Sequence, residues 1–264
     1  MLRNIKDLKG YAIQATDGAI GHVSDFFFDD ETWVVRYLVV DTGNWLMHRK
    51  VLISPLAFGQ PNWTDKELPI SLTKEQVKNS PDIDTEMPVS RQHEIRHLSY
   101  YGYPYYWGEG GIWGEGTTPG MMMTGYGGFV TTSHTENEEA QREEALRQDG
   151  DSHLRSYNAV MDYHIQATDG GIGHIQSLLV DQDTWAIHYF VVETSNWWLG
   201  HQVLIPAEWI DDINWAESII SVDLTRQAVK DAPPYDAEVE LDRDQESEIH
   251  EHYGRIGYWA GDRG

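Results

Sequence analysis

The sequence contains no cysteine and no long apolar segment. Without cysteine the chain has no disulfide, no thiolate metal site and no cysteine nucleophile, which fits a reducing compartment. Charged residues interrupt the first ten positions, MLRNIKDLKG, so these do not resemble a signal peptide. No apolar run approaches the roughly 18–20 residues that span a bilayer as a helix. We therefore expect a soluble, cytoplasmic protein without membrane insertion.

Basic residues are also scarce. The chain has 19 Lys and Arg residues against 43 Asp and Glu residues, a net charge of −24. The net charge is −3 in residues 1–107, −6 in residues 108–155 and −15 in residues 156–264. Because neutralisation of phosphates supplies much of the affinity for nucleic acid, this distribution argues against nucleic acid as a partner.

The chain repeats itself. Residues 13–22 read IQATDGAIGH, and residues 165–174 read IQATDGGIGH. The offset of 152 continues without a gap to Tyr106-Trp107 and Tyr258-Trp259. Two copies of one structural unit are therefore expected. We divide the chain into a first copy with a helix and aromatic tail at 1–107, a Gly/Met-rich and then acidic linker at 108–155, and a second copy with an acidic C-terminal helix at 156–264.

Short runs of β-type residues recur about every ten positions and predict an antiparallel meander or small barrel in each copy. Asp17-Gly18 and Asp169-Gly170 are typical of type I′ hairpin turns. Helical segments are expected at 73–79 and 90–100 and at the aligned positions 225–231 and 242–252, where capping boxes begin with Thr73 and Asp242. The predicted strands are 11–15, 20–29, 33–41, 50–54 and 68–72 in copy one, and 163–167, 172–181, 185–193, 202–205 and 219–224 in copy two.

One motif indicates catalysis. His93, Glu94 and His97 form an HExxH pattern, which on a helix places two imidazoles and a general base for a zinc hydrolase. Only the glutamate recurs in copy two, as Glu246, and no third ligand motif follows. GxSxG, P-loop and GxGxxG patterns are absent. We therefore expect no enzymatic activity, no metal site and no cofactor, with the zinc hydrolase as the least favoured alternative.

Tryptophans next to turn residues are candidates for partner binding. Aromatic residues on loops are frequent anchors of protein interfaces, although equivalent tryptophans in two copies are equally compatible with a small-barrel core. The candidates are Trp45, Trp63, Trp197, Trp198 and Trp215.

The segment ATDGAIGHVSDFFFDDETWVVRYLVVDTGNWLMHRKVLISP, with its partner ATDGGIGHIQSLLVDQDTWAIHYFVVETSNWWLGHQVLIP, resembles the PRC-barrel family. This small barrel is named for the cytoplasmic domain of the H subunit of purple-bacterial photosynthetic reaction centres, and it also forms the C-terminal part of a ribosome maturation factor. The later segments resemble free-standing bacterial members. The resemblance implies a mainly β fold with two small antiparallel PRC-type β-barrels in tandem, each followed by short helices.

The resemblance implies a docking role without known catalytic residues. The leading hypothesis is a non-enzymatic protein that binds a protein partner, or itself, through barrel surfaces and loop aromatics. Exposed barrel edges and aromatic tails are compatible with a homodimer. The alternative is an accessory protein that associates peripherally with a photosynthetic or other membrane electron-transfer complex, by analogy with the H subunit.

Overall fold

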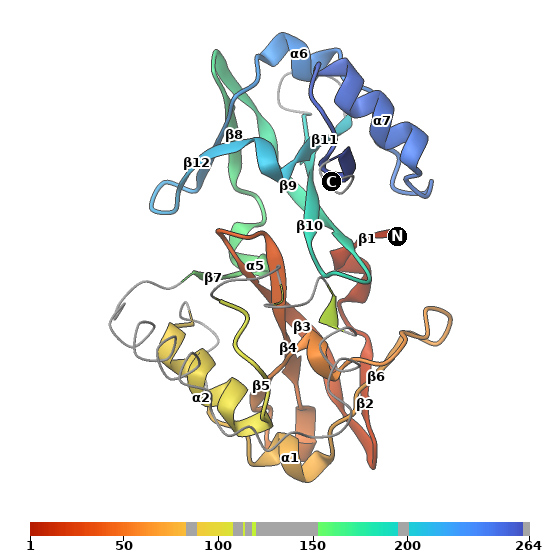
Figure 1. Cartoon of the computed structure of the whole chain (residues 1–264), viewed down its shortest axis with the longest axis vertical. Coiled ribbons are helices and arrows are strands. Elements are labelled where there is room, and N and C mark those ends of the chain that lie inside the picture. The colour runs from red at the N-terminus through yellow and green to blue at the C-terminus, as the bar shows by residue number, and fades with distance from the viewer. Residues whose placement is uncertain (83–88, 108–112, 114–117, 120–152, 195–200, 261–264) are drawn as a thin grey trace. The chain divides into compact units, whose positions relative to one another are not determined.

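The computed structural model describes residues 1–82, 89–107, 113, 118–119, 153–194 and 201–260. The chain forms two compact units (Figure 1). The N-terminal unit comprises Leu8–Ala159 and Gln182–Ala186, and the C-terminal unit comprises Met1–Asp7, Val160–Asp181 and Ile187–Gly264. Each unit is built on one sheet, so the predicted mainly β fold is confirmed.

The sheet of the N-terminal unit has the strand order β5-β4-β3-β2-β6, and β7 pairs with β3. The sheet is open, because its terminal strands β5 and β6 do not pair with each other. Strands β2 and β6 run parallel, whereas the meander predicted only antiparallel neighbours. The strands are β2 (Ala12–Ala15), β3 (Gly18–Asp29), β4 (Val34–Asp41), β5 (Lys50–Ile53), β6 (Glu67–Pro69) and β7 (Leu154–Ser156).

The C-terminal unit repeats this arrangement. Its sheet has the order β11-β10-β9-β8-β13-β12, with β1 paired to β9 and with β8 and β13 parallel. The strands are β1 (Leu2–Asn4), β8 (His164–Ala167), β9 (Gly170–Asp181), β10 (Ile187–Glu193), β11 (Gln202–Pro206), β12 (Ile210–Asn214) and β13 (Ile219–Val222).

Strands β1 and β7 occupy aligned positions in the two copies, since Leu2 and Leu154 differ by the offset of 152. Each nevertheless belongs to the sheet of the other copy. In β1, Arg3 lies opposite Val180 of β9, and in β7, Arg155 lies opposite Phe28 of β3. The two copies therefore exchange their first strands. The sequence did not predict β1, β7 or β12, because three to five residues without alternation carry no periodic signal.

A polar pair accompanies each exchanged strand. Ser156 donates its hydroxyl to Asp25 Oδ2 at 2.6 Å, and the backbone N–H of Asn158 donates to Asp25 Oδ1 at 3.0 Å. In the C-terminal unit the hydroxyl is on the sheet instead, where Ser177 donates to Asn4 Oδ1. Because Asp25, Asn4 and Ser177 are buried, these bonds satisfy polar groups that would otherwise lose their water partners at a cost of about 1–3 kcal/mol.

The N-terminal unit also receives the turn that precedes β10. The backbone N–H of Val35 donates to the carbonyl of Trp185 at 2.9 Å, and the Trp185 ring lies 5.0 Å from that of Phe58. Trp185 adopts a φ of 62°, so it belongs to a turn and not to the strand predicted to begin there.

The requirement for glycine at the last glycine position of each repeated motif is steric. Gly21 and Gly173 adopt φ values of 152° and 154°. A Cβ atom at either position would lie 2.0 Å from a carbonyl oxygen, that of Asp41 or Glu193. Only glycine allows the neighbouring strand to approach so closely.

The hairpins after β2 and β8 differ from the type I′ prediction. Ala15 pairs with Gly18, so the turn residues are Thr16 and Asp17 and not Asp17-Gly18. A type I′ turn needs positive φ at both central residues, and neither adopts it. Asp17 instead accepts a bond from the N–H of Lys74 at 2.7 Å, and Asp169 caps the aligned helix through the N–H of Arg226 at 2.7 Å. The aspartates therefore recur because they cap helices.

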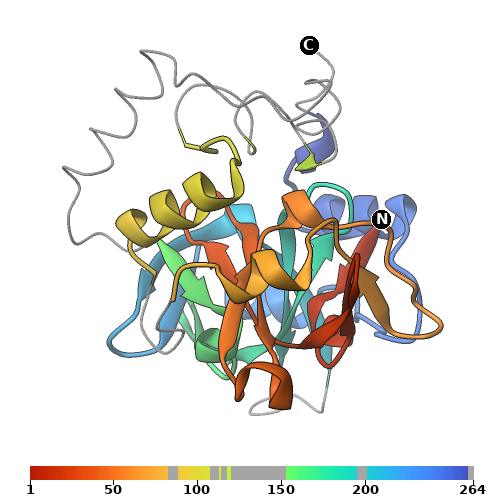
Figure 2. The ribbon, with the colours of Figure 1, turned by 90° about the horizontal axis from the view of Figure 1, so that it is seen from below.

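The predicted helices are confirmed within one or two residues at each end. Both predicted capping boxes form, at Thr73 and at Asp242. Helix α2 runs along one side of the N-terminal sheet, and α7 lies beside β11 (Figure 1, Figure 2). The helices are α1 (Lys74–Lys78), α2 (Arg91–Tyr101), α5 (Tyr157–Val160), α6 (Arg226–Lys230) and α7 (Arg243–His252), with short 3-10 turns at Ile5–Leu8, Gly43–Leu46, Pro55–Ala57, Ala207–Trp209 and Tyr258–Ala260.

Within the described part of the chain, no helix combines the length and the apolar character that crossing a membrane requires.

Candidate functional site

The HExxH helix places its glutamate in a buried cluster. Glu94 is 2% exposed, and both of its carboxylate oxygens accept hydrogen bonds. Arg91 donates to Oε2 at 3.0 Å, and the Tyr106 hydroxyl donates to Oε1. Arg91 also donates to the Tyr106 oxygen at 3.0 Å. The carboxylate thus ties the aromatic tail to helix α2.

A second buried cation completes the cluster. The guanidinium carbon of Arg36 lies 3.7 Å from the centroid of the Tyr106 ring and 4.8 Å from that of Trp113. Trp113 is 2% exposed, and its indole N–H donates to the carbonyl of Thr184 at 2.7 Å. We call Glu94, Arg91, Arg36, Tyr106 and Trp113 the Glu94 centre.

Burial controls the ionisation of this centre. Desolvation raises the pKa of Glu94 to about 7, although attraction to Arg91 and the bond from Tyr106 act in the opposite direction. Burial also lowers the pKa of Arg36 and raises that of Tyr106 well above its usual value. A pKa near neutrality suits a general acid or base. The Glu94 carboxylate, however, is enclosed and already bonded on both oxygens.

The two histidines of the motif have separate environments. His93 is exposed, and its Nδ1 contacts the Ser90 hydroxyl at 2.9 Å. His97 is buried, and its Nε2 donates to the carbonyl of Leu52 at 3.0 Å. Among the described residues, no group of three or more His, Asp and Glu side chains is arranged to hold a metal ion. The structure therefore does not bring His93, Glu94 and His97 together as a ligand set.

We expect His97→Ile to change the pH dependence of stability. Burial lowers the pKa of His97 to about 4, so between its ordinary pKa of 6.5 and that value the folded state binds fewer protons than the unfolded state. Wild-type stability is consequently lost as the pH falls through this window. When the pH falls from about 7.5 to about 5, the free energy of unfolding of the variant should rise by about 2 kcal/mol relative to that of wild type. Urea unfolding at both pH values measures the difference.

The aligned residue Ile249 makes isoleucine the natural replacement, and His93→Ala is the matched control at an exposed position. Glu94 contributes the opposite slope, because its raised pKa makes stability fall as the pH rises towards 7. Taking the difference between variant and wild type removes this contribution. Parallel pH profiles for wild type and His97→Ile would contradict the assignment.

The Glu94 centre has a counterpart in the C-terminal unit. Glu246 accepts bonds from the hydroxyls of Tyr258 at 2.7 Å and Tyr189 at 3.0 Å, and it lies 3.3 Å from Arg243. Arg36 is replaced by His188, whose ring stacks on Tyr258 with centroids 3.9 Å apart. The sequence signal for this pair of clusters is therefore the recurrence of arginine, glutamate and tyrosine at the offset of 152. The HExxH motif contains only the glutamate of these three residues.

The tryptophan candidates differ in their surroundings. Trp63 is half-buried with its ring 5.9 Å from that of Tyr11, and Trp215 has the same relation to Tyr163 at 6.1 Å. Both pack within their own unit, at aligned positions. Trp45 is half-buried, with the Lys74 ammonium 4.7 Å from its ring centroid. Trp197 and Trp198 lie outside the described residues.

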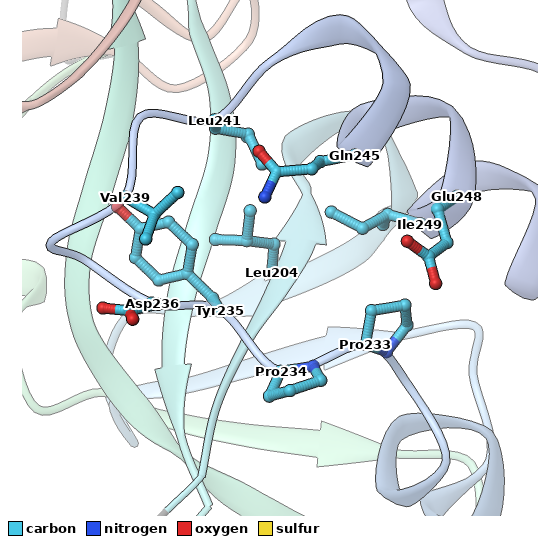
Figure 3. A pocket seen from close by; sticks show the side chains of 10 residues that line it. All are labelled: Leu204, Pro233, Pro234, Tyr235, Asp236, Val239, Leu241, Gln245, Glu248 and Ile249. Atoms are coloured by element: carbon cyan, nitrogen blue, oxygen red, sulfur yellow. The ribbon is translucent and has the colours of Figure 1, made fainter.

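The C-terminal unit contains an open groove between β11, the segment that follows α6, and α7 (Figure 3). It holds about 500 Å³ of space continuous with solvent. Leu204, Leu241 and Ile249 face this space, with the carboxylates of Asp236 and Glu248 on opposite sides. Sequence reasoning did not find this site. We call it the acidic groove, lined by Leu204, Pro233, Pro234, Tyr235, Asp236, Val239, Leu241, Gln245, Glu248 and Ile249.

Residues 2–64 match the family model of the PRC-barrel domain. This segment is similar to a PRC-barrel domain. The match extends from β1 to Thr64 and ends before β6, so it includes Arg36 but no other residue of the Glu94 centre, and the acidic groove lies outside it. The chain has no match among curated proteins. Assignment of the second copy to the PRC-barrel family, and the relation to the reaction-centre H subunit with its membrane complex, stay predictions.

Proposed function

We propose that this PRC-barrel protein is a non-enzymatic docking protein, and that its second copy binds a basic, partly apolar segment of another protein. The acidic groove carries this proposal. Its edges offer the carboxylates of Asp236 and Glu248, and its accessible apolar contact comes from Val239, because Leu204 and Ile249 on its floor are buried. Val239 is 50% exposed at this groove and adds apolar surface there.

The charge around the groove supports a basic partner. Residues 231–251 contain nine acidic residues and one basic residue, whereas the aligned residues 79–99 contain four acidic and two basic residues. A partner segment with Lys or Arg next to apolar side chains matches both features of the groove. Opposite charge at the edges would steer the encounter and select against acidic partners.

The Glu94 centre supports a role without catalysis. Two groups with strongly perturbed protonation, Glu94 and Tyr106, bond to each other inside the N-terminal unit. Their counterparts Glu246 and Tyr258 do the same in the C-terminal unit. Such a recurring arrangement is explained by anchoring of an aromatic tail in each copy.

A labelled peptide tests the docking proposal. We expect a fluorescein-labelled peptide of alternating leucine and lysine to bind the full chain in a fluorescence anisotropy titration. The double variant Asp236→Lys/Glu248→Lys should bind it at least about tenfold more weakly, because each charge reversal replaces attraction by repulsion at the groove. The same peptide with glutamate in place of lysine should not bind.

Two further variants separate groove binding from general attraction to an acidic protein. Asp211→Lys/Asp212→Lys makes the same change in net charge at exposed positions of β12, outside the groove, and should retain most of the binding. Val239→Ser keeps the charge and should weaken binding by removing apolar contact. Equal affinity of the peptide for both double variants would refute the proposal.

A further inference from the structure

The N-terminal unit covers its buried cluster with a tryptophan from outside the repeated fold. Trp113 has its ring centroid 4.8 Å from the guanidinium carbon of Arg36 and 6.3 Å from the ring centroid of Tyr106. Its indole N–H donates to the carbonyl of Thr184 at 2.7 Å. Arg36 and Tyr106 are only 1% and 7% exposed. Trp113 therefore acts as a cover that keeps the cluster away from water.

The aligned cluster of the C-terminal unit is more open. His188 and Tyr258 stand at the positions of Arg36 and Tyr106 and are half-buried, whereas the residues of the first copy are buried. In the described part of the C-terminal unit, His188 has a ring contact with Tyr258 and none with a tryptophan. The second copy therefore repeats the cluster without repeating its cover.

The exposed side of this cluster is chemically suited to an indole. The His188 ring stacks on Tyr258 with an angle of 19° between the planes. Burial lowers the pKa of His188 to about 4, so the ring is uncharged at neutral pH and favours aromatic contact over the binding of an anion. The guanidinium of Arg243 lies 5.3 Å from the Tyr258 centroid, and this side chain is 54% exposed. An aromatic ring next to an accessible guanidinium is the combination that Trp113 contacts in the first copy.

We propose that the C-terminal unit binds a tryptophan of another protein at His188 and Tyr258, as the N-terminal unit binds its own Trp113. Tryptophan is favoured over the other aromatic residues because its ring attracts a cation such as Arg243 most strongly. Tryptophan is also frequent among the residues that dominate binding energy at protein interfaces. Trp113 is 2% exposed, so a second copy of this chain does not offer it as the ligand.

The segment that carries Trp113 indicates what the partner offers. Residues 110–114 read GGIWG, so glycines surround the tryptophan and no charge is adjacent to it. Glycine lets the backbone approach the site closely, because it has no side chain to clash with the cluster. The tryptophan site shares no residue with the acidic groove. This inference therefore goes beyond the basic segment proposed for the groove and does not depend on it.

A peptide of the sequence GGIWG, blocked at both ends and carrying 5-fluorotryptophan, tests the site by fluorine NMR. On titration with the full chain, we expect its resonance to shift and to saturate at one site per chain. His188→Ala should weaken binding about three- to tenfold, because it removes one aromatic contact. His188→Arg should retain binding, because a guanidinium lies against the indole in the first copy.

His174→Ala is the matched control, since His174 is another half-buried histidine of the same sheet but is not part of the cluster. It should bind the peptide like wild type. A resonance that wild type does not shift, or equal affinity for wild type and His188→Ala, would overturn the inference. In the first case, a shift with Trp113→Ala would show that only the first copy accepts a tryptophan. The peptide is uncharged, so its failure to bind would leave the leucine-lysine peptide as a separate test of the acidic groove.

Discussion

Leu154→Asp is expected to unfold the N-terminal unit, although the residue belongs to the first strand of the second copy. Leu154 is fully buried and packs with Phe27, Tyr37 and Leu52. Truncating a buried leucine typically costs about 2–5 kcal/mol, and an unpaired carboxylate at the same place costs more. Hydrogen exchange with mass spectrometry should show loss of protection in peptides that cover β4, with peptides that cover β10 retaining theirs.

Leu2→Asp is the matched control, because it changes the aligned residue of the first copy. Leu2 is only half-buried and pairs through β1 with β9 of the C-terminal unit. Its effect should be smaller and should appear in peptides of β9 and β10. Loss of protection in the C-terminal unit on changing Leu154 would contradict the exchange of first strands.

Glu94→Ala is expected to destabilise the N-terminal unit by about 3–5 kcal/mol, because it leaves the buried guanidinium of Arg91 without its paired carboxylate and removes a negative charge that also attracts Arg36. Arg36 is 1% exposed and Arg91 is 8% exposed, so neither is well placed to recover hydration. The Tyr106 hydroxyl also loses its acceptor. Denaturant-dependent hydrogen exchange in β4 peptides measures the free energy of unfolding of this unit.

Two comparisons make the Glu94 prediction specific. Glu246→Ala should cost less in β10 peptides, because the Arg243 side chain is 54% exposed and His188 stands where the first copy has Arg36. Glu94→Gln should cost less than Glu94→Ala, since an amide oxygen can still accept the bond from Tyr106. Equal costs for Glu94→Ala and Glu246→Ala would contradict the role assigned to the buried arginines.

Local features of the sequence predicted much of each unit. Thr73 with Gln76 and Asp242 with Gln245 form their capping boxes, because such pairs satisfy backbone groups within four residues. The motif glycine at 21 is explained by its contact with Asp41, which the sequence could not show. Likewise, the pair Asp17-Gly18 predicts a hairpin turn, whereas the bond that Asp17 accepts from the N–H of Lys74 depends on a helix 57 residues away.

The candidate site depended more strongly on tertiary structure. HExxH spacing places residues on a helix but does not specify what packs against it. Here the sheet buries His97 against Leu52, and Tyr106 satisfies Glu94. Trp113 lies in the predicted linker, and only the folded unit places it over Arg36. The acidic groove combines β11 with residues more than twenty-five positions later, so its charge was visible in the sequence and its apolar floor was not.

By itself, the sequence determined the duplication, the β-rich composition of each copy, the helices that follow and the concentration of negative charge in the second half. These properties follow from residue identity and short spacing, which act within a few residues along the chain. Tertiary structure alone decided that β1 and β7 change places, that Glu94 is a buried anchor and that Trp113 covers Arg36. Those outcomes depend on which surfaces of the chain pack together. The free energy of burying two surfaces depends on both segments in the folded state, and neither segment determines it alone.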